Sequence, residues 1–136
     1  MKVNLINFNI KGDFDGNLIA IENSKNIPFS IKRAFYIFNT QPNVIRGKHA
    51  HYKTNQVLIC ISGSCSIKLF DGMSTKVIQL TNNTTGLLLP PHYWHEMYDF
   101  SDGAILMVLA DTLYDESDYI RDKDTFIKYT QTLTIT

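Results

Sequence analysis

Two histidines two positions apart, His49 and His51, are the residues of this sequence best suited to chemistry. In an extended segment the side chains at i and i+2 leave the same face, so both imidazoles would point to one place. Imidazole is a common metal ligand, and its unperturbed pKa near 6.5 also suits it to proton transfer. The pair therefore indicates either a metal site or a site that moves protons.

A second segment, GLLLPPHYWHEM, adds a third candidate, because Gly86 and Pro90 precede His95 there. Gln56 follows the first pair, and its neutral amide is a much weaker ligand than a carboxylate for a hard divalent ion. Three imidazoles alone can still hold zinc or iron, so the spacing leaves metal binding open. His92 falls outside this pattern and is interpreted as a loop residue.

The elements that must position these residues are short apolar runs separated by turn signals. The runs are rich in Val, Ile, Thr, Phe and Tyr, and the breaks carry SG, DG, NN and SDG. Such spacing predicts an all-β antiparallel sandwich or barrel. The expected strands lie within residues 3–10, 17–22, 31–39, 56–62, 66–71, 74–80, 86–90, 94–100 and 104–110. Only residues 115–131 predict a helical segment, with Ser117 or Asp118 as its N-cap.

The length of the chain and the absence of a linker or repeat predict a single domain over residues 1–136. Thirteen basic residues balance thirteen acidic ones, which gives no broad field for nucleic acid or anionic lipid. The N-terminus lacks the pattern of a signal peptide, and no apolar run approaches the roughly 18 residues of a membrane span. A cytoplasmic location is expected.

Two cysteines, Cys60 and Cys65, flank the sequence ISGS. If Ser62 and Gly63 form a two-residue hairpin turn, the cysteines face each other across two strands. A redox pair is one interpretation, and reduced, buried thiols are the preferred one.

The order of these residues resembles the two motifs of the cupin superfamily. The first motif corresponds to His49, His51, Gln56 and Gly63, and the second to Gly86, Pro90 and His95. The resemblance implies a small antiparallel β-barrel of jelly-roll type with its site inside. Most metal-binding cupins have Glu where this chain has Gln56, and that departure weakens the expectation of a metal.

A closer resemblance is to the dTDP-4-keto-6-deoxy-glucose 3,4-ketoisomerases. It is carried by RGKHAHYKTNQVLICISGSCSIKLFDG, LLLPPHYWHEM and LYDESDYIRDKDTF, and runs from RAFYIFN to the end of the chain. It implies a cupin site used without metal or other cofactor and a dTDP-linked keto-sugar bound in the barrel. The product is the 3-keto isomer, an intermediate of 3-amino-deoxy sugars.

Moving a carbonyl from C4 to C3 passes through an enediol and needs two proton transfers at carbon. The resemblance implies His51 as the base at C3 and His49 as its partner, delivering a proton at C4 or to the oxygens. His95 would orient them or donate a hydrogen bond to the enediol. Such positioned groups typically contribute about 10²–10⁴-fold each. A purely structural role for the three histidines is the alternative.

Further residues are candidates for binding the substrate. Arg46 could hold the diphosphate in a bidentate manner, with a surface salt bridge as the alternative. Arg33 and Tyr36 have an odd separation and should not share a face, so Tyr36 would line the site and Arg33 would serve the nucleotide. Gln56 could hydrogen-bond an imidazole or the sugar. Trp94 is expected in the core, and Arg121 is expected to pin the C-terminal segment.

Two other functions compete with the isomerase. A three-histidine, metal-dependent cupin dioxygenase would need His49, His51 and His95 around one ion. A non-catalytic sugar-nucleotide-binding cupin would bind without turnover. The resemblance also implies a homodimer, and the exposed N-terminal strand suggests that the two chains exchange their N-terminal strands.

Overall fold

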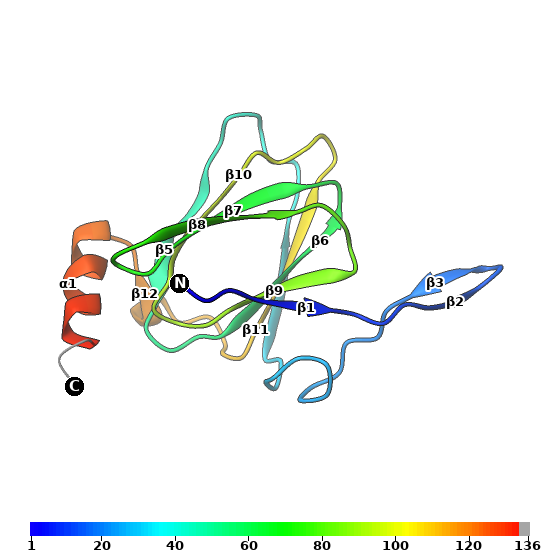
Figure 1. Ribbon diagram of the computed structural model, residues 1–136, viewed down its shortest axis with the longest axis horizontal. Coiled ribbons are helices and arrows are strands. Elements are labelled where there is room, and N and C mark those ends of the chain that lie inside the picture. The colour runs from blue at the N-terminus through cyan, green and yellow to red at the C-terminus, as the bar shows by residue number, and fades with distance from the viewer. Residues whose placement is uncertain (134–136) are drawn as a thin grey trace.

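The body of the protein is built from two antiparallel five-stranded sheets, in a computed structural model that describes residues 1–133 (Figure 1). The first sheet has the order β1 (Asn4–Asn7), β9 (Thr85–Leu89), β6 (Gln56–Ser62), β11 (Ile105–Ala110) and β4 (Arg33–Ile37). The second has the order β12 (Tyr119–Ile120), β5 (Arg46–His51), β10 (Trp94–Tyr98), β7 (Cys65–Phe70) and β8 (Thr75–Leu80). This is the predicted antiparallel jelly roll.

The strand β6 shows why the sequence folds into layers. Leu58 and Cys60 point between the sheets, where they join the main apolar core with Leu69, Leu87 and Leu106. Val57 and Ile59 point the other way, into a second cluster that Ile27 and Phe29 help to cover. Because β6 is buried on both faces, its sequence is a continuous apolar run rather than an alternating one.

The connection between β6 and β7 corrects one expectation. The two strands were predicted to form a hairpin through Ser62 and Gly63, but β6 pairs with β9 and β11, whereas β7 pairs with β8 and β10. The chain therefore crosses from one sheet to the other at this turn. Cys60 and Cys65 are nevertheless buried, free thiols that contact each other.

The N-terminal segment is also shorter and more divided than predicted. The strand expected over residues 3–10 is limited to β1, which pairs with β9 at the edge of the first sheet. A hairpin of β2 (Lys11–Asp13) and β3 (Gly16–Leu18) follows, where a polar connection was expected. Figure 1 shows this hairpin extending away from the two sheets, and all of its residues are exposed.

The C-terminal segment was predicted as one short helix or two turns, and it contains three elements. A 3₁₀ turn (Glu116–Asp118) is followed by β12 and then by α1 (Lys123–Leu133). The N-cap of α1 is Asp122, whose carboxylate accepts hydrogen bonds from the Thr125 amide and hydroxyl, and not Ser117 or Asp118. Within residues 1–133, no helix has the length and apolar character needed to cross a membrane.

Two glycines with the same backbone conformation allow a test of the sheet-to-sheet turn. Gly63 and Gly103 both have φ near 72°, so alanine at either position meets the left-handed penalty of about 1–2 kcal/mol. At Gly63 a Cβ would also lie 2.3 Å from Ser101 Oγ and 3.0 Å from Ala104 Cα, whereas at Gly103 it meets nothing within 4 Å. We expect Gly63→Ala to lower the free energy of unfolding by about 1–3 kcal/mol more than Gly103→Ala. Urea denaturation measures both, and equal losses would contradict the crowding at Gly63.

Candidate active site

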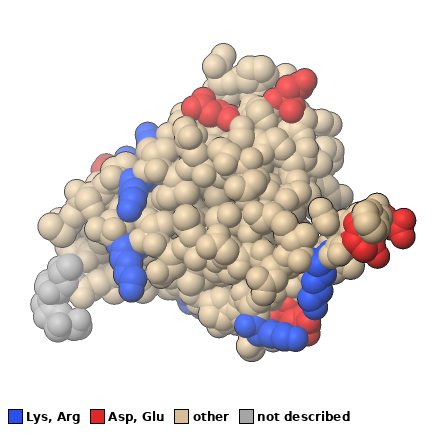
Figure 2. All heavy atoms as spheres, turned by 45° about the vertical axis from the view of Figure 1, so that its right-hand side comes forward, with Lys and Arg blue, Asp and Glu red and all other residues tan. Residues whose placement is uncertain are grey.

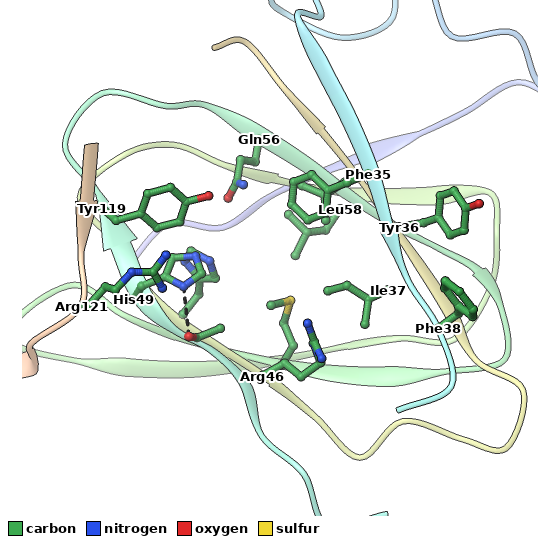
Figure 3. A pocket seen from close by; sticks show the side chains of 14 residues that line it. Phe35, Tyr36, Ile37, Phe38, Arg46, His49, Gln56, Leu58, Tyr119 and Arg121 are labelled. Carbon is green, nitrogen blue, oxygen red and sulfur yellow. Dashed lines mark hydrogen bonds between the residues drawn. The ribbon is translucent and has the colours of Figure 1, made fainter. Parts of the chain in front are cut away.

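A cavity of about 370 Å³ opens between the two sheets, within the range of roughly 300–1,000 Å³ typical of small-molecule sites. Its wall combines apolar side chains from β4, β6, β10 and β11 with polar groups from β5 and the C-terminal segment (Figure 3). The polar and charged residues among its lining are Tyr36, Arg46, His49, Gln56, His95, Tyr119 and Arg121. Sequence-distant segments therefore meet at one concave surface.

A β-bulge in β5 decides which side chains of that strand reach the cavity. His49 pairs with His95 and Gly47 with Glu96, so Lys48 is the extra residue of the bulge. Gly47 and Lys48 have φ of 85° and 58°, both in the left-handed region. Because the extra residue resets the alternation, Arg46 and His49 both line the cavity despite their odd separation.

The three predicted histidines form one cluster. The ring centroids of His49 and His95 are 4.5 Å apart, those of His49 and His51 5.2 Å, and those of His51 and His95 6.0 Å. The rings also contact Tyr119, whose centroid lies 4.9 Å from that of His49 and 4.4 Å from that of His51. The spacing of the three histidines along the sequence thus correctly predicted that their imidazoles lie together.

Each imidazole is held through its Nδ1 atom by a group that can only accept a hydrogen bond. The Gly47 carbonyl lies 3.0 Å from His49 Nδ1, the Tyr93 carbonyl 3.3 Å from His95 Nδ1, and Asp118 Oδ2 3.1 Å from His51 Nδ1. Each Nδ1 must therefore carry the hydrogen, which leaves Nε2 of the neutral ring as an acceptor.

Burial makes these histidines poor proton carriers. It is the largest cause that lowers the pKa of His49 to about 4, and the charge of His51 adds to it. Burial also lowers the pKa of His95 well below the ordinary value, followed by the charges of His49 and His51. The pKa of His51 is lowered by burial as well, although Asp118 opposes this shift. At neutral pH, His49 is therefore an unprotonated base that faces the cavity.

The histidines do not have equal access to the cavity. His49 and His95 line it, whereas His51 is not among its lining residues and lies against Asp118. His51 and His95 are equally buried, each 3% exposed, so His49 is the most accessible of the three. The Nε2 atom of His51 is buried and has no hydrogen-bond partner among the described residues.

The predicted binding residues take different positions. Arg46 and Gln56 line the cavity, and Gln56 is buried there. Tyr36 borders the cavity, but its ring is 65% exposed and lies across β4 from His49 (Figure 3). Arg33 is absent from the lining, and its guanidinium carbon lies 5.7 Å from the ring centroids of both Phe35 and Tyr114. Tyr36 therefore lines the cavity as predicted, although its ring is largely exposed, and the expected nucleotide contact of Arg33 stays a prediction.

Three residues of the C-terminal segment were not predicted as site residues. Tyr119 and Arg121 line the cavity, and Asp118 holds His51 from behind. Arg121 does pin this segment, as expected, since its Nε and Nη2 atoms lie 2.5 and 2.9 Å from the carboxylate of Glu116. No local pattern indicated Asp118 or Tyr119, because β12 pairs with a strand nearly seventy residues earlier.

Trp94 and His92 behave as predicted. Trp94 is buried against Phe126, with ring centroids 5.9 Å apart, and is a core residue. His92 lies outside the cluster, where its Nε2 is 3.0 Å from the Tyr52 carbonyl and 3.3 Å from the Tyr129 hydroxyl.

The cluster could also hold a metal ion. The ligand nitrogens of His49, His51 and His95 all lie within 4.8 Å of one another, and their Nδ1 hydrogens are engaged as in many metal sites. Three neutral nitrogens fit a borderline ion such as Zn²⁺ better than a hard one, and Gln56 adds no charge. Such an ion would supply Lewis-acid polarisation of a bound carbonyl.

Comparisons with known proteins agree on one group of relatives. Residues 1–131 match the family described as FdtA: WxcM-like, C-terminal. A TDP-4-oxo-6-deoxy-α-D-glucose 3,4-oxoisomerase of Aneurinibacillus thermoaerophilus is 51% identical over 129 residues, which cover 95% of this chain and 93% of the relative.

Solved structures give the same result. A mutant of the 3,4-ketoisomerase QdtA from Thermoanaerobacterium thermosaccharolyticum, in complex with TDP-4-keto-6-deoxyglucose, is similar with a TM-score of 0.93 and 42% identity. The match covers 96% of this chain and 94% of that one. A 3,4-ketoisomerase from Helicobacter canadensis has a TM-score of 0.93, 47% identity and coverage of 96% and 98%. The predicted cupin fold is confirmed.

The lowered histidine pKa values predict acid sensitivity. The unfolded chain takes up protons on these residues near pH 6.5, whereas folded His49 does so only near pH 4. Stability is therefore highest above pH 6.5 and falls as the pH drops toward 4, by up to about 1.4 kcal/mol per pH unit for each such histidine. Urea denaturation at pH 7.5, 6.0 and 5.0 measures this slope. His49→Gln should make it shallower, and an unchanged slope would contradict the shift.

Proposed function

The chain belongs to the FdtA family (WxcM-like, C-terminal) and is a TDP-sugar 3,4-ketoisomerase, and from this premise we propose how its residues act. The substrate is a dTDP-linked 4-keto-6-deoxyhexose, which matches the TDP-4-keto-6-deoxyglucose bound by the QdtA mutant. The observation that carries the proposal is the cluster of three imidazoles at the cavity between the two sheets. Neither the dioxygenase nor the non-catalytic binding protein finds support in these relatives.

We assign the keto-sugar to the cavity, with its reacting carbons against His49 and its diphosphate toward Arg46. Arg46 extends from β5 on the cavity side (Figure 3). It has no carboxylate partner among the ion pairs of residues 1–133. A guanidinium can bind phosphate oxygens in a bidentate manner. Gln56, buried in the opposite wall, offers both a donor and an acceptor to sugar hydroxyls.

The first proton transfer is assigned to His49. Its Nε2 lone pair removes the proton from C3, the electron pair of the C–H bond forms the C3–C4 double bond, and the C4 oxygen takes up a proton to give the enediol. The enediol then loses its C3 hydroxyl proton and gains a proton at C4. This assignment reverses the expected order of His49 and His51, because His49 lines the cavity and His51 does not.

Two other groups are placed to stabilise charge on the oxygens. Tyr119 packs its ring against His49 and His51 and directs its hydroxyl into the cavity (Figure 3). His95 lines the same wall from β10. Donors fixed in a buried site stabilise a developing enediolate without reorganisation during the reaction.

The expectation that no metal takes part stays a prediction, supported by the neutral Gln56 where metal-binding cupins carry a carboxylate. Elemental analysis of active protein checks it, and turnover that a chelator abolishes and zinc or iron restores would contradict it. The single-domain organisation and the cytoplasmic location also stay predictions.

We further propose a homodimer in which the β2–β3 hairpins are exchanged. The hairpin extends from the body, and Ile10, Phe14 and Leu18 on or beside it are exposed. The forward face of Figure 2 carries few charged side chains across its centre, which favours burial against a second chain. β1 and β4 are edge strands that could accept such an exchange.

The proposed dimer makes a simple prediction. Phe14→Asp places a charge on the fully exposed tip of the hairpin and should weaken association by burying that charge. Light scattering at micromolar concentration should give a dimer for the natural chain and a shift toward monomer for the variant. Lys11→Glu, on the same hairpin, is a control for a charge change away from the exposed Phe14 ring. A natural chain that is monomeric would refute the proposal.

The mechanism predicts specific losses of rate. His49→Asn retains a polar side chain but cannot act as a base, so kcat should fall by about 10²–10⁴-fold while affinity for TDP changes little. NMR of the product from dTDP-4-keto-6-deoxyglucose establishes the isomer formed. In D₂O, deuterium should enter at C4, because the proton passes through a histidine. A product without deuterium at C4, or near-normal turnover by His49→Asn, would contradict this mechanism.

A further inference from the structure

Asp118 is a buried carboxylate in contact with the histidine cluster, and the mechanism above gives it no role. Its Oδ2 lies 3.1 Å from His51 Nδ1, and its Oδ1 accepts the Lys53 amide at 2.8 Å. The Thr54 hydroxyl donates to Oδ2 as well. Asp118 and His51 both have side chains that are only 2% exposed, so solvent does not screen their contact.

The two donors that hold this carboxylate in place, the Lys53 amide and the Thr54 hydroxyl, both come from the connection that follows β5. Thr54 Oγ1 also lies 2.8 Å from Thr112 Oγ1, just beyond β11. Asp118 itself ends the 3₁₀ turn before β12. The carboxylate therefore has a fixed orientation before any substrate binds, as an effective positioning group requires.

The partner of each Nδ1 atom distinguishes His51 from the other two histidines. His49 and His95 face the neutral carbonyls of Gly47 and Tyr93, whereas His51 alone faces a carboxylate. A carboxylate favours the doubly protonated ring far more than a carbonyl does. Of the three rings, His51 is the one whose surroundings can compensate a positive charge.

Other charged and titratable groups near His51 act against that charge or are neutral. Arg33 from β4 and Arg121 beyond β12 both disfavour a proton on His51, as burial does. His49, His95 and the phenol of Tyr119 complete its surroundings. Asp118 is the only anion among the causes that act on the pKa of His51, and burial outweighs it, so the net shift of that pKa is downward.

We propose that Asp118, anchored by Thr54, is a positioning residue that fixes the Nδ1–H tautomer of His51 and thereby keeps its Nε2 atom as a hydrogen-bond acceptor. The consequence for turnover rests on the proposed isomerase function. Ring nitrogens of the three histidines lie within 4.8 Å of one another, so an acceptor held there can receive a hydrogen bond from a substrate hydroxyl beside His49. His49 remains the group that accepts the C3 proton.

The tautomer can be measured without turnover. The chain has four histidines, so ¹⁵N NMR of histidine-labelled protein is tractable. In the natural protein, His51 should carry its hydrogen on Nδ1, and in Asp118→Asn it should lose that strict preference, because an amide can donate to Nδ1 as well as accept from it. A natural protein in which His51 carries its hydrogen on Nε2 alone would overturn the proposal.

Kinetics test the consequence for catalysis. Asp118→Asn should lower kcat on the order of 10²-fold with KM changed less than about threefold. Asp118→Glu restores a carboxylate and should recover part of the rate together with the Nδ1–H tautomer. An Asp118→Asn variant with unchanged kcat and an unchanged tautomer of His51 would overturn the proposal.

Thr54 provides a second variant if Asp118→Asn does not fold. Thr54→Val removes the hydroxyl that donates to Asp118 at nearly constant volume and should weaken the preference of His51 for the Nδ1–H tautomer, by less than Asp118→Asn does. Thr54→Ser keeps the hydroxyl and should leave the tautomer unchanged. A purely structural role would lower stability in Thr54→Val and leave the tautomer unchanged. If the tautomer is as expected but no 3-keto sugar forms, the isomerase function fails and the assignment of the tautomer stands.

Discussion

The contact between His51 and Asp118 joins two parts of the chain that are 67 residues apart, and much of the site depends on it. It fixes the end of the 3₁₀ turn against β5, and the antiparallel pairing of Tyr119 with His51 follows directly. That pairing places the Tyr119 ring over two imidazoles and brings Arg121 to the cavity wall. Besides this carboxylate, the Tyr52 amide anchors the C-terminal segment here, since it donates to the Asp118 carbonyl at 3.0 Å.

The cluster combines two opposing physical effects. Burial lowers the pKa of all three histidines and so provides an unprotonated base at neutral pH. Buried polar atoms must also be satisfied, and acceptors from the barrel wall engage every Nδ1 hydrogen. The remaining Nε2 atoms converge on one region, where a substrate with acidic C–H and O–H groups can use them. The same arrangement that disfavours charge thus prepares proton transfer.

The bulge in β5 shows how a small irregularity controls the cavity. Regular alternation would direct Arg46 and His49 to opposite faces, and the extra residue Lys48 brings them to the same one. Gly47 is needed there because its φ is 85° and a Cβ would lie 3.0 Å from the His95 carbonyl oxygen. An arginine for phosphate and a histidine for carbon chemistry thereby share one wall.

The sequence by itself determined the strand-rich fold and the three histidines, because alternation, turn residues and the spacing of His49, His51 and His95 are local patterns. It could not assign β6 and β7 to different sheets, since a turn of two residues suits a hairpin and a crossing equally. Tertiary structure alone placed Asp118 behind His51, brought Tyr119 and Arg121 to the cavity wall and exposed His49 rather than His51 to the cavity. Those outcomes depend on long-range strand pairing and on burial, and neither is written in the spacing of residues along the chain.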